Sequence, residues 1–253
     1  MKISTVFQTN FPFVPSRFPI YYGWVIVVFT TLGMMSSIPG QTMGVGVYTD
    51  FLIQSSHLTR MQISMAYMTG TILSSLLLPL AGRYYDLLGA RIMIVFSGIG
   101  LGFSLLLFSE ASTLIQLLQS IFPDLSSLSS ELFVMTVIFL LLRQFGQGIM
   151  AMVSRNTLAK WFERRRGLVS GISGIFVAFS FSGAPLFMNI IIEDYNYSGS
   201  MVLMALIFGF GMAFIGWLFF RDNPEDCGLL MDGKKISPMT QSNEPAEPEV
   251  TLK

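Results

Sequence analysis

Six apolar runs alternate with short polar connections along the 253-residue chain. Each run is near the roughly 20 residues that an α-helix needs to cross a bilayer. The pattern predicts an all-α membrane protein, a six-transmembrane-helix bundle over residues 21–220. We expect its spans at residues 24–48, 61–81, 92–108, 132–153, 168–192 and 201–220.

Outside these runs the composition changes. Residues 1–20 contain three prolines and form the predicted N-terminal tail. Residues 221–253 become rich in Pro, Glu, Ser and Thr, which bury too little apolar surface to fold, so a largely disordered tail is expected there. The longer link at 109–131 has two interpretations. It either extends the third helix or forms a short amphipathic helix at the interface.

The sharpest polar interruption is the stretch GRYYDLLGAR at residues 82–91, between the second and third runs. Hydrocarbon does not tolerate such a concentration of charge and glycine, so the stretch predicts a tight polar turn at a membrane surface. One interpretation is an ordinary basic hairpin, with Gly for the turn and Arg for orientation. The other is a functional motif, for which the spacing Gly-x-x-x-Asp-x-x-Gly-x-Arg argues.

Lys and Arg are distributed asymmetrically between the two sets of connections. With the N-terminus in the cytoplasm, 13 of the 15 basic residues fall on the cytoplasmic side. Arg60 falls outside and Arg143 within a helix. Because positive residues are retained inside, we expect both termini in the cytoplasm, and an integral multi-pass protein of a plasma or inner membrane.

Composition excludes several other classes of protein. Of the residues 52% are hydrophobic and only 12% charged, about half the charged fraction of a soluble domain. A single cysteine and a single histidine leave no internal disulfide and no His/Cys metal cluster. Paired carboxylates inside a span are also missing, so we expect no enzyme, no metal, no cofactor and no nucleic-acid partner.

Arg143 is the most informative polar residue, because it lies near the centre of the fourth run. At 1.5 Å per residue it is about 15 Å from either surface, too deep to reach water by snorkelling. Gln147 follows one turn later on the same face. A central Arg costs ~2.5–3.5 kcal/mol and must face protein or a water-filled cavity. It is either an anion-attracting group of a transport pathway or an Arg satisfied permanently between helices.

Two further spans contribute candidates for the same pathway. In the first span, Pro39 predicts a kink or unwinding near Ser36, which would let freed carbonyls and Gln41 line a cavity. In the second span, Tyr67 lies in a polar stripe that faces the cavity or packs through its hydroxyls. The spans contain no Asp or Glu, so an anion balanced by Arg143 is a better substrate than a cation.

The 82–91 turn resembles the loop between the second and third helices of the major facilitator superfamily of secondary transporters. Four further segments are similar to its oxalate/formate-exchanger and monocarboxylate-porter branch. They are YYGW at 21–24, RQFGQG at 143–148, KWFERRRG at 160–167 and PEDCGL at 224–229. Members have about twelve helices in two halves with the substrate between them, so the resemblance covers an N-terminal six-helix half.

The resemblance implies secondary transport of a small organic anion, a mono- or dicarboxylate, by alternating access. It implies a second six-helix half as partner, from a separate chain or a missing C-terminal part, besides the lipid bilayer. It also implies a conformational latch at the cytoplasmic face, made by Gly82, Arg83, Asp86, Gly89, Arg91 and Arg155. Asp86 would hold Arg91 or Arg155 in one state, or else only solvate the turn. The alternative to transport is a membrane scaffold or receptor-like protein.

Overall fold

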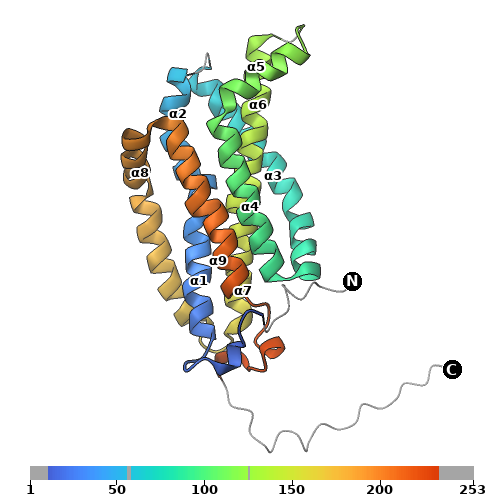
Figure 1. Ribbon diagram of the computed structural model, residues 1–253, viewed down its shortest axis with the longest axis vertical. Helices are drawn as coiled ribbons and strands as arrows, with labels where there is room; N and C mark the ends of the chain where they lie inside the picture. Colours follow the sequence, from blue (N-terminus) through green and yellow to red (C-terminus); the bar gives the residue numbers. More distant parts are fainter. Residues whose placement is uncertain (1–10, 56–57, 125, 234–253) are drawn as a thin grey trace, which may run out of the picture.

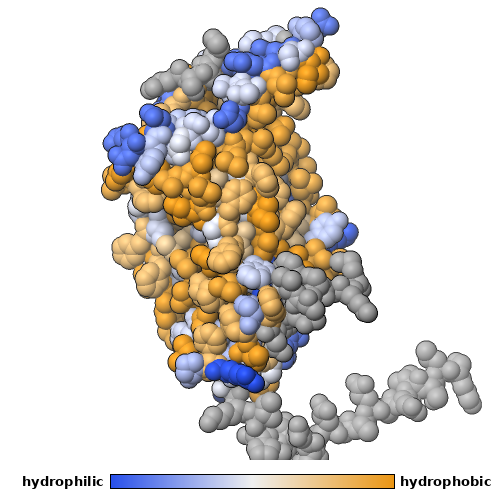
Figure 2. Space-filling view, in the orientation of Figure 1, coloured by the Kyte–Doolittle hydropathy of each residue, from blue (hydrophilic) through white to orange (hydrophobic). Residues whose placement is uncertain are grey.

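The computed structural model describes residues 11–55, 58–124 and 126–233. Its ordered elements are helical, and they form an elongated bundle whose long helices run roughly along one axis (Figure 1). Five helical segments are long and apolar enough to cross a membrane, at Gly23–Ile53, Arg60–Leu88, Ala90–Ser109, Ser127–Trp161 and Arg166–Phe219. Figure 2 shows apolar side chains over the middle of the visible face and hydrophilic ones mainly towards its ends. This is an all-α membrane fold.

The first segment is broken where Pro39 predicts a break. Helix α1, Gly23–Ser36, ends ahead of a 3₁₀ turn, η3, Ile38–Gly40, and α2, Thr42–Ser55, then continues upwards. Gln41 between them has an extended backbone, with φ −85° and ψ 158°. Since proline removes a backbone donor and clashes with the preceding turn, the helix is interrupted there.

Helix α3, Arg60–Leu88, is longer than the predicted second span. A capping box begins it, in which Thr59 Oγ1 accepts from Gln62 N and Gln62 Oε1 accepts from Thr59 N at 2.8 Å. The helix continues seven residues past Ala81, so Arg83 and Asp86 lie on its last two turns. The expected polar turn over 82–91 is therefore wrong in its extent, because only Gly89 separates α3 from α4, Ala90–Ser109.

The link after α4 forms a separate helix, α5, Ala111–Ile121, so the third helix does not simply extend. Leu114, Ile115 and Leu118 pack against the main core, whereas Leu117 and Ile121 are exposed. The next segment joins α6, Ser127–Leu142, through a π-helix, η4, Arg143–Met150, to α7, Ala151–Trp161.

The last 54-residue segment contains both remaining predicted spans. It begins with α8, Arg166–Met204, and continues through a π-helix, η5, Ala205–Gly211, into α9, Met212–Phe219. At 1.5 Å per residue a straight helix of this length would be about 80 Å long, far more than a bilayer is thick. The chain reverses at Asn196, where φ is 59°, and its two legs run in opposite directions (Figure 1).

Beyond α9 the chain is described as far as residue 233. Two short 3₁₀ turns, η6, Glu225–Cys227, and η7, Met231–Gly233, lie at the lower end of the bundle, where η7 contacts α1 and α7 (Figure 1). We call residues 221–233 the strap. This part of the expected disordered tail is thus folded onto the bundle, and residues 234–253 lie outside the described range.

Candidate functional site

The break in the first span brings its backbone against η4. A Cβ built on Gly146 would lie 3.0 Å from the Cα of Gly40, and a Cβ on Gly40 would lie 3.0 Å from the Cα of Gly146. Two glycines facing each other let the helices approach more closely than side chains would allow. This close contact explains Gly146 as a packing residue and positions η4 beside Gln41.

Arg143 is the first residue of η4 and lies near the middle of the Ser127–Trp161 segment, as predicted. Its Nη1 donates to the carbonyl oxygen of Gly40 at 3.5 Å, a long hydrogen bond. Its Cζ lies 5.4 Å from the ring centre of Tyr67, a cation–π contact. The ion pairs found among the described residues do not include Arg143. With five N–H donors and few acceptors, its guanidinium retains capacity for an anion.

Arg143 lines a polar cavity of about 440 Å³ between α3, η3, η4 and α7, which we call the arginine cavity. Gln41 and Gln147 line it too, so three of the four predicted pathway residues meet there. The fourth, Tyr67, reaches the site through its ring contact with Arg143, while its hydroxyl shares a 2.9 Å hydrogen bond with Thr42. Exposed Ser75, Arg155 and Asn156 also line the cavity, which is therefore a recess on the side of the bundle.

Two polar atoms on the wall of the arginine cavity lack a protein partner. Gln147 Oε1 and Thr71 Oγ1 are buried, and neither forms a hydrogen bond within the described part of the chain. An unpaired buried polar atom costs ~1–3 kcal/mol, so water or a polar ligand is needed there. Gln41 is satisfied differently, because its Nε2 donates to Ser37 Oγ at 3.0 Å.

Arg155 is a second cation of this cavity, whereas the sequence analysis assigned it to the latch and not to the pathway. In a regular α-helix, residues 12 apart point about 120° away from each other, so Arg143 and Arg155 would not share a face. The π-helical η4 lies between them and changes the phase of the helix. Periodicity read at 3.6 residues per turn contains no signal for this change.

One buried hydrogen bond joins α3 to η4 between the arginine cavity and a neighbouring recess. Ser74 Oγ on α3 donates to Gln144 Oε1 on η4 at 2.9 Å. Ser74 lines the arginine cavity, whereas Gln144 lines a separate apolar recess between α3, α4 and η4. This bond therefore separates a polar cavity from an apolar one.

The residues predicted as a latch lie in different surroundings. Arg83 and Asp86 are exposed on α3, Gly82 has open space around it, and Arg155 belongs to the arginine cavity. Arg91 is buried, and its Nε donates to the carbonyl oxygen of Trp217 at 2.6 Å. In this conformation Asp86 pairs with neither Arg91 nor Arg155 among the ion pairs of the described residues.

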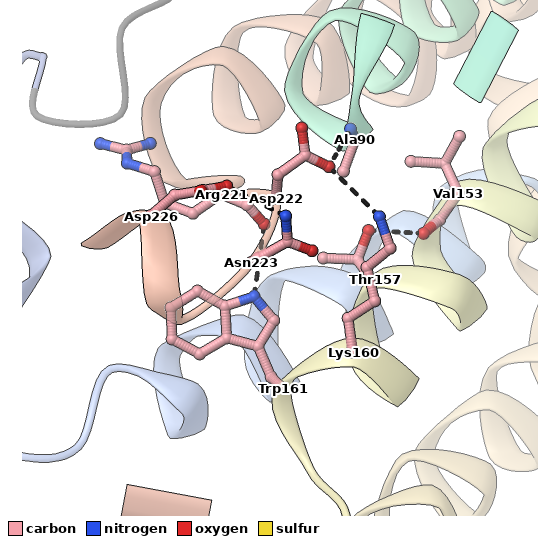
Figure 3. A network of polar contacts seen from close by, with 9 residues as sticks. All are labelled: Ala90, Val153, Thr157, Lys160, Trp161, Arg221, Asp222, Asn223 and Asp226. Atoms are coloured by element: carbon pink, nitrogen blue, oxygen red, sulfur yellow. Dashed lines mark hydrogen bonds and ion pairs between the residues drawn. The ribbon is translucent and has the colours of Figure 1, made fainter. Parts of the chain in front are cut away.

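The strap contains a carboxylate, Asp222, that the sequence analysis did not identify as a contact between elements. Asp222 Oδ1 accepts from the backbone N–H of Ala90 at 2.7 Å and lies 3.7 Å from Lys160 Nζ (Figure 3). Lys160 Nζ is also 4.7 Å from the ring centre of Tyr85. A carboxylate at a helix N-terminus is favoured by the free N–H groups and the helix dipole. Asp222 therefore connects the strap to α4 and α7.

Further hydrogen bonds hold the rest of the strap against the end of α7 and the residues that precede α8. Trp161 Nε1 donates to the carbonyl oxygen of Arg221 at 3.3 Å (Figure 3). Asp232 accepts from the backbone N–H groups of residues 163, 164 and 165, at 3.3, 2.8 and 3.2 Å, ahead of α8. Cys227 is buried between these anchors, and burial raises the pKa of its thiol to about 12, partly offset by the positive charge of Arg221. The strap is thus joined to α4, to α7 and to the connection between α7 and α8.

Comparison with known proteins agrees with this architecture. The sequence matches the Major Facilitator Superfamily over residues 23–241, most of the chain. No curated protein and no solved structure matches it. The matched region contains all five apolar segments, the α3–α4 turn and the arginine cavity. The protein is thus an integral membrane transporter and not an enzyme, and the chain belongs to the major facilitator superfamily.

Proposed function

We propose that the chain carries a small organic anion, a mono- or dicarboxylate, and that Arg143 is its principal contact. The observation that supports this most is a central arginine, beside a polar cavity, without an ion-pair partner among the described carboxylates. Coulomb attraction grows as the dielectric falls, so a carboxylate is bound more strongly in such a recess than in water. Arg155, lining the same cavity, adds a second positive charge to the pathway.

The neutral groups around the guanidinium complete the proposed site. The free acceptor of Gln147 and the hydroxyl of Thr71 give a ligand polar partners. Tyr67 covers one side of the guanidinium and fixes its position through the cation–π contact. A preorganised charge loses little freedom on binding, so the arrangement favours the affinity of the site for its ligand.

We further propose that this bundle is one half of the working transporter. The arginine cavity is open at its side, as expected if a second six-helix bundle closes it during alternating access. The small-residue ridge of Gly167, Gly171 and Gly174 on α8 has open space where neighbours would pack. Both termini belong in the cytoplasm on this proposal, with Asp86 free to meet helix N-termini of the second half.

Transport by the complete system tests the proposal. The chain is reconstituted in liposomes with the second half, and uptake of labelled mono- and dicarboxylates is measured. Arg143→Gln should lower uptake at least ~10-fold, the effect of losing a charge-assisted hydrogen bond, without changing membrane insertion. The matched control is Arg164→Gln, an exposed arginine away from the cavity. Unchanged uptake by Arg143→Gln would remove Arg143 from the site, and no saturable uptake by the native pair would favour a scaffold.

A further inference from the structure

The apolar recess on the far side of η4 from the arginine cavity has a volume of about 420 Å³, and we call it the apolar groove. Its floor consists of buried Ala81, Met93, Gln144 and Ile149. Its walls are exposed, with Leu80 on α3 at 48% and Phe96 on α4 at 52% of their possible surface. The groove is therefore a hollow between α3, α4 and η4 that is open to the surroundings of the bundle.

Water is a poor occupant of this groove. Its one buried amide, Gln144, already accepts from Ser74 Oγ, so that acceptor is paired. The arginine cavity differs, since Gln147 Oε1 and Thr71 Oγ1 on its wall lack partners. A site holds water when it offers two to four polar partners, and the apolar groove does not.

The position of the groove determines which apolar group is available. It runs along two membrane-crossing helices, so the molecules next to it are lipids. An empty recess would leave Leu80, Phe96 and Met93 without dispersion partners on one side, and an acyl chain supplies them. Tyr84 lines the groove one helical turn before the end of α3, and it is 49% exposed and combines an apolar ring with a hydroxyl, as residues at the headgroup level do.

A basic residue outside the lining of the groove, next to Tyr84 in the chain, favours one class of headgroup. Arg83 is exposed and directly precedes Tyr84, within two turns of the end of α3. A guanidinium binds a phosphate through paired hydrogen bonds, and a basic residue at the surface favours anionic lipids. We propose that the apolar groove binds one anionic phospholipid, with an acyl chain between α3 and α4 and its phosphate on Arg83.

Lipid titration of the full chain tests this proposal. The chain is purified in detergent, stripped of lipid and titrated with phosphatidylglycerol or phosphatidylcholine of identical acyl chains, and bound lipids are counted by native mass spectrometry. One site should bind phosphatidylglycerol about fivefold more tightly than phosphatidylcholine. This ratio is the contribution to affinity expected from a single basic residue next to an anionic headgroup. Ala81→Trp fills the floor and should weaken both lipids at least tenfold, whereas Arg83→Gln should abolish only the preference for phosphatidylglycerol.

Matched controls separate the site from general surface effects. Ala178→Trp places the same bulk on an exposed face of α8, and Arg164→Gln removes an exposed arginine elsewhere, so both should bind like the native chain. Circular dichroism checks folding, and Leu80→Gln, which makes a wall polar, replaces Ala81→Trp if that variant does not fold. Native-like binding by the folded groove variants, or equal losses in the controls, overturns the proposal. So does cross-linking of a second copy through Leu80→Cys in place of lipid binding.

Discussion

Gly89 lies directly against the carboxylate of Asp222. A Cβ on residue 89 would overlap Asp222 Oδ2, and the φ of +82° at Gly89 is one that side-chain-bearing residues rarely adopt. The single-residue turn between α3 and α4 therefore depends on glycine for two independent reasons. It also places the first N–H of α4 where Asp222 Oδ1 accepts it at 2.7 Å.

Alanine at residue 89 should consequently be far more damaging than alanine at residue 82. Gly89→Ala combines positive φ with displacement of Asp222, and we expect it to lower the free energy of unfolding by about 1–3 kcal/mol. Gly82 is inside α3 with open space around it, so Gly82→Ala should be neutral or stabilising by up to ~1 kcal/mol. Unfolding in mixed micelles measures both. Equal losses would contradict the packing of Gly89 against the strap.

Adjacent serines on α3 provide a second matched pair. Ser74→Ala leaves the buried Oε1 of Gln144 without its donor and should cost ~1–3 kcal/mol of unfolding free energy. Ser75 is exposed and donates to the carbonyl oxygen of Ile72, so Ser75→Ala should change stability by less than ~0.5 kcal/mol. Thermal and denaturant unfolding distinguish the two variants, and a harmless Ser74→Ala would mean that the wall between the cavities does not depend on this bond.

Much of the fold is predictable from local pattern, because hydrophobic runs and Pro39 act on their own neighbourhood. Residues 82–88 are misassigned because charge near a membrane surface does not by itself end a helix. Helix α3 ends only at Leu88, because the turn that follows requires the positive φ of Gly89. The apolar runs similarly locate the segment that contains Arg143.

The candidate site is predictable only in part. Arg143, Gln147 and Gln41 are found because polar residues inside apolar runs stand out locally. Arg155 is placed by a π-helical change of phase, which a 3.6-residue period does not reveal. Asp222 caps a helix that begins 132 residues earlier, and contacts of that sequence separation leave no local trace.

Cys227 gives the lower end of the bundle a pH-dependent stability. Its thiol has a pKa of about 12 in the folded chain, against an ordinary value of 9.0. The unfolded chain therefore loses this proton first, and stability falls between pH 9 and pH 12, by at most ~1.4 kcal/mol per pH unit. Measured over this range, the native chain should lose stability more steeply than Cys227→Ser. Parallel curves would contradict a buried, protonated thiol.

The same thiol reports opening of the strap, since it is the chain's only cysteine. Asp232→Asn replaces one of the two acceptor oxygens that hold residues 163–165 with a donor. A lost cap costs ~1 kcal/mol, so maleimide labelling of Cys227 should become about fivefold faster. Glu225→Gln, an exposed change within the strap, is the control and should label at the native rate. Unaltered labelling of Asp232→Asn would show that Asp232 does not hold the strap closed.

Protection of a cysteine in the arginine cavity tests the central claim most directly. Ser75→Cys in a Cys227→Ser background places one reactive thiol on the cavity wall, and its labelling rate by a neutral thiol reagent is measured with small mono- and dicarboxylates. Amides of the same acids serve as uncharged controls. At least one carboxylate should slow labelling in a saturable manner, its amide should not, and Arg143→Gln should abolish the protection. Protection that survives Arg143→Gln, or labelling that no carboxylate slows, would contradict an anion site at Arg143.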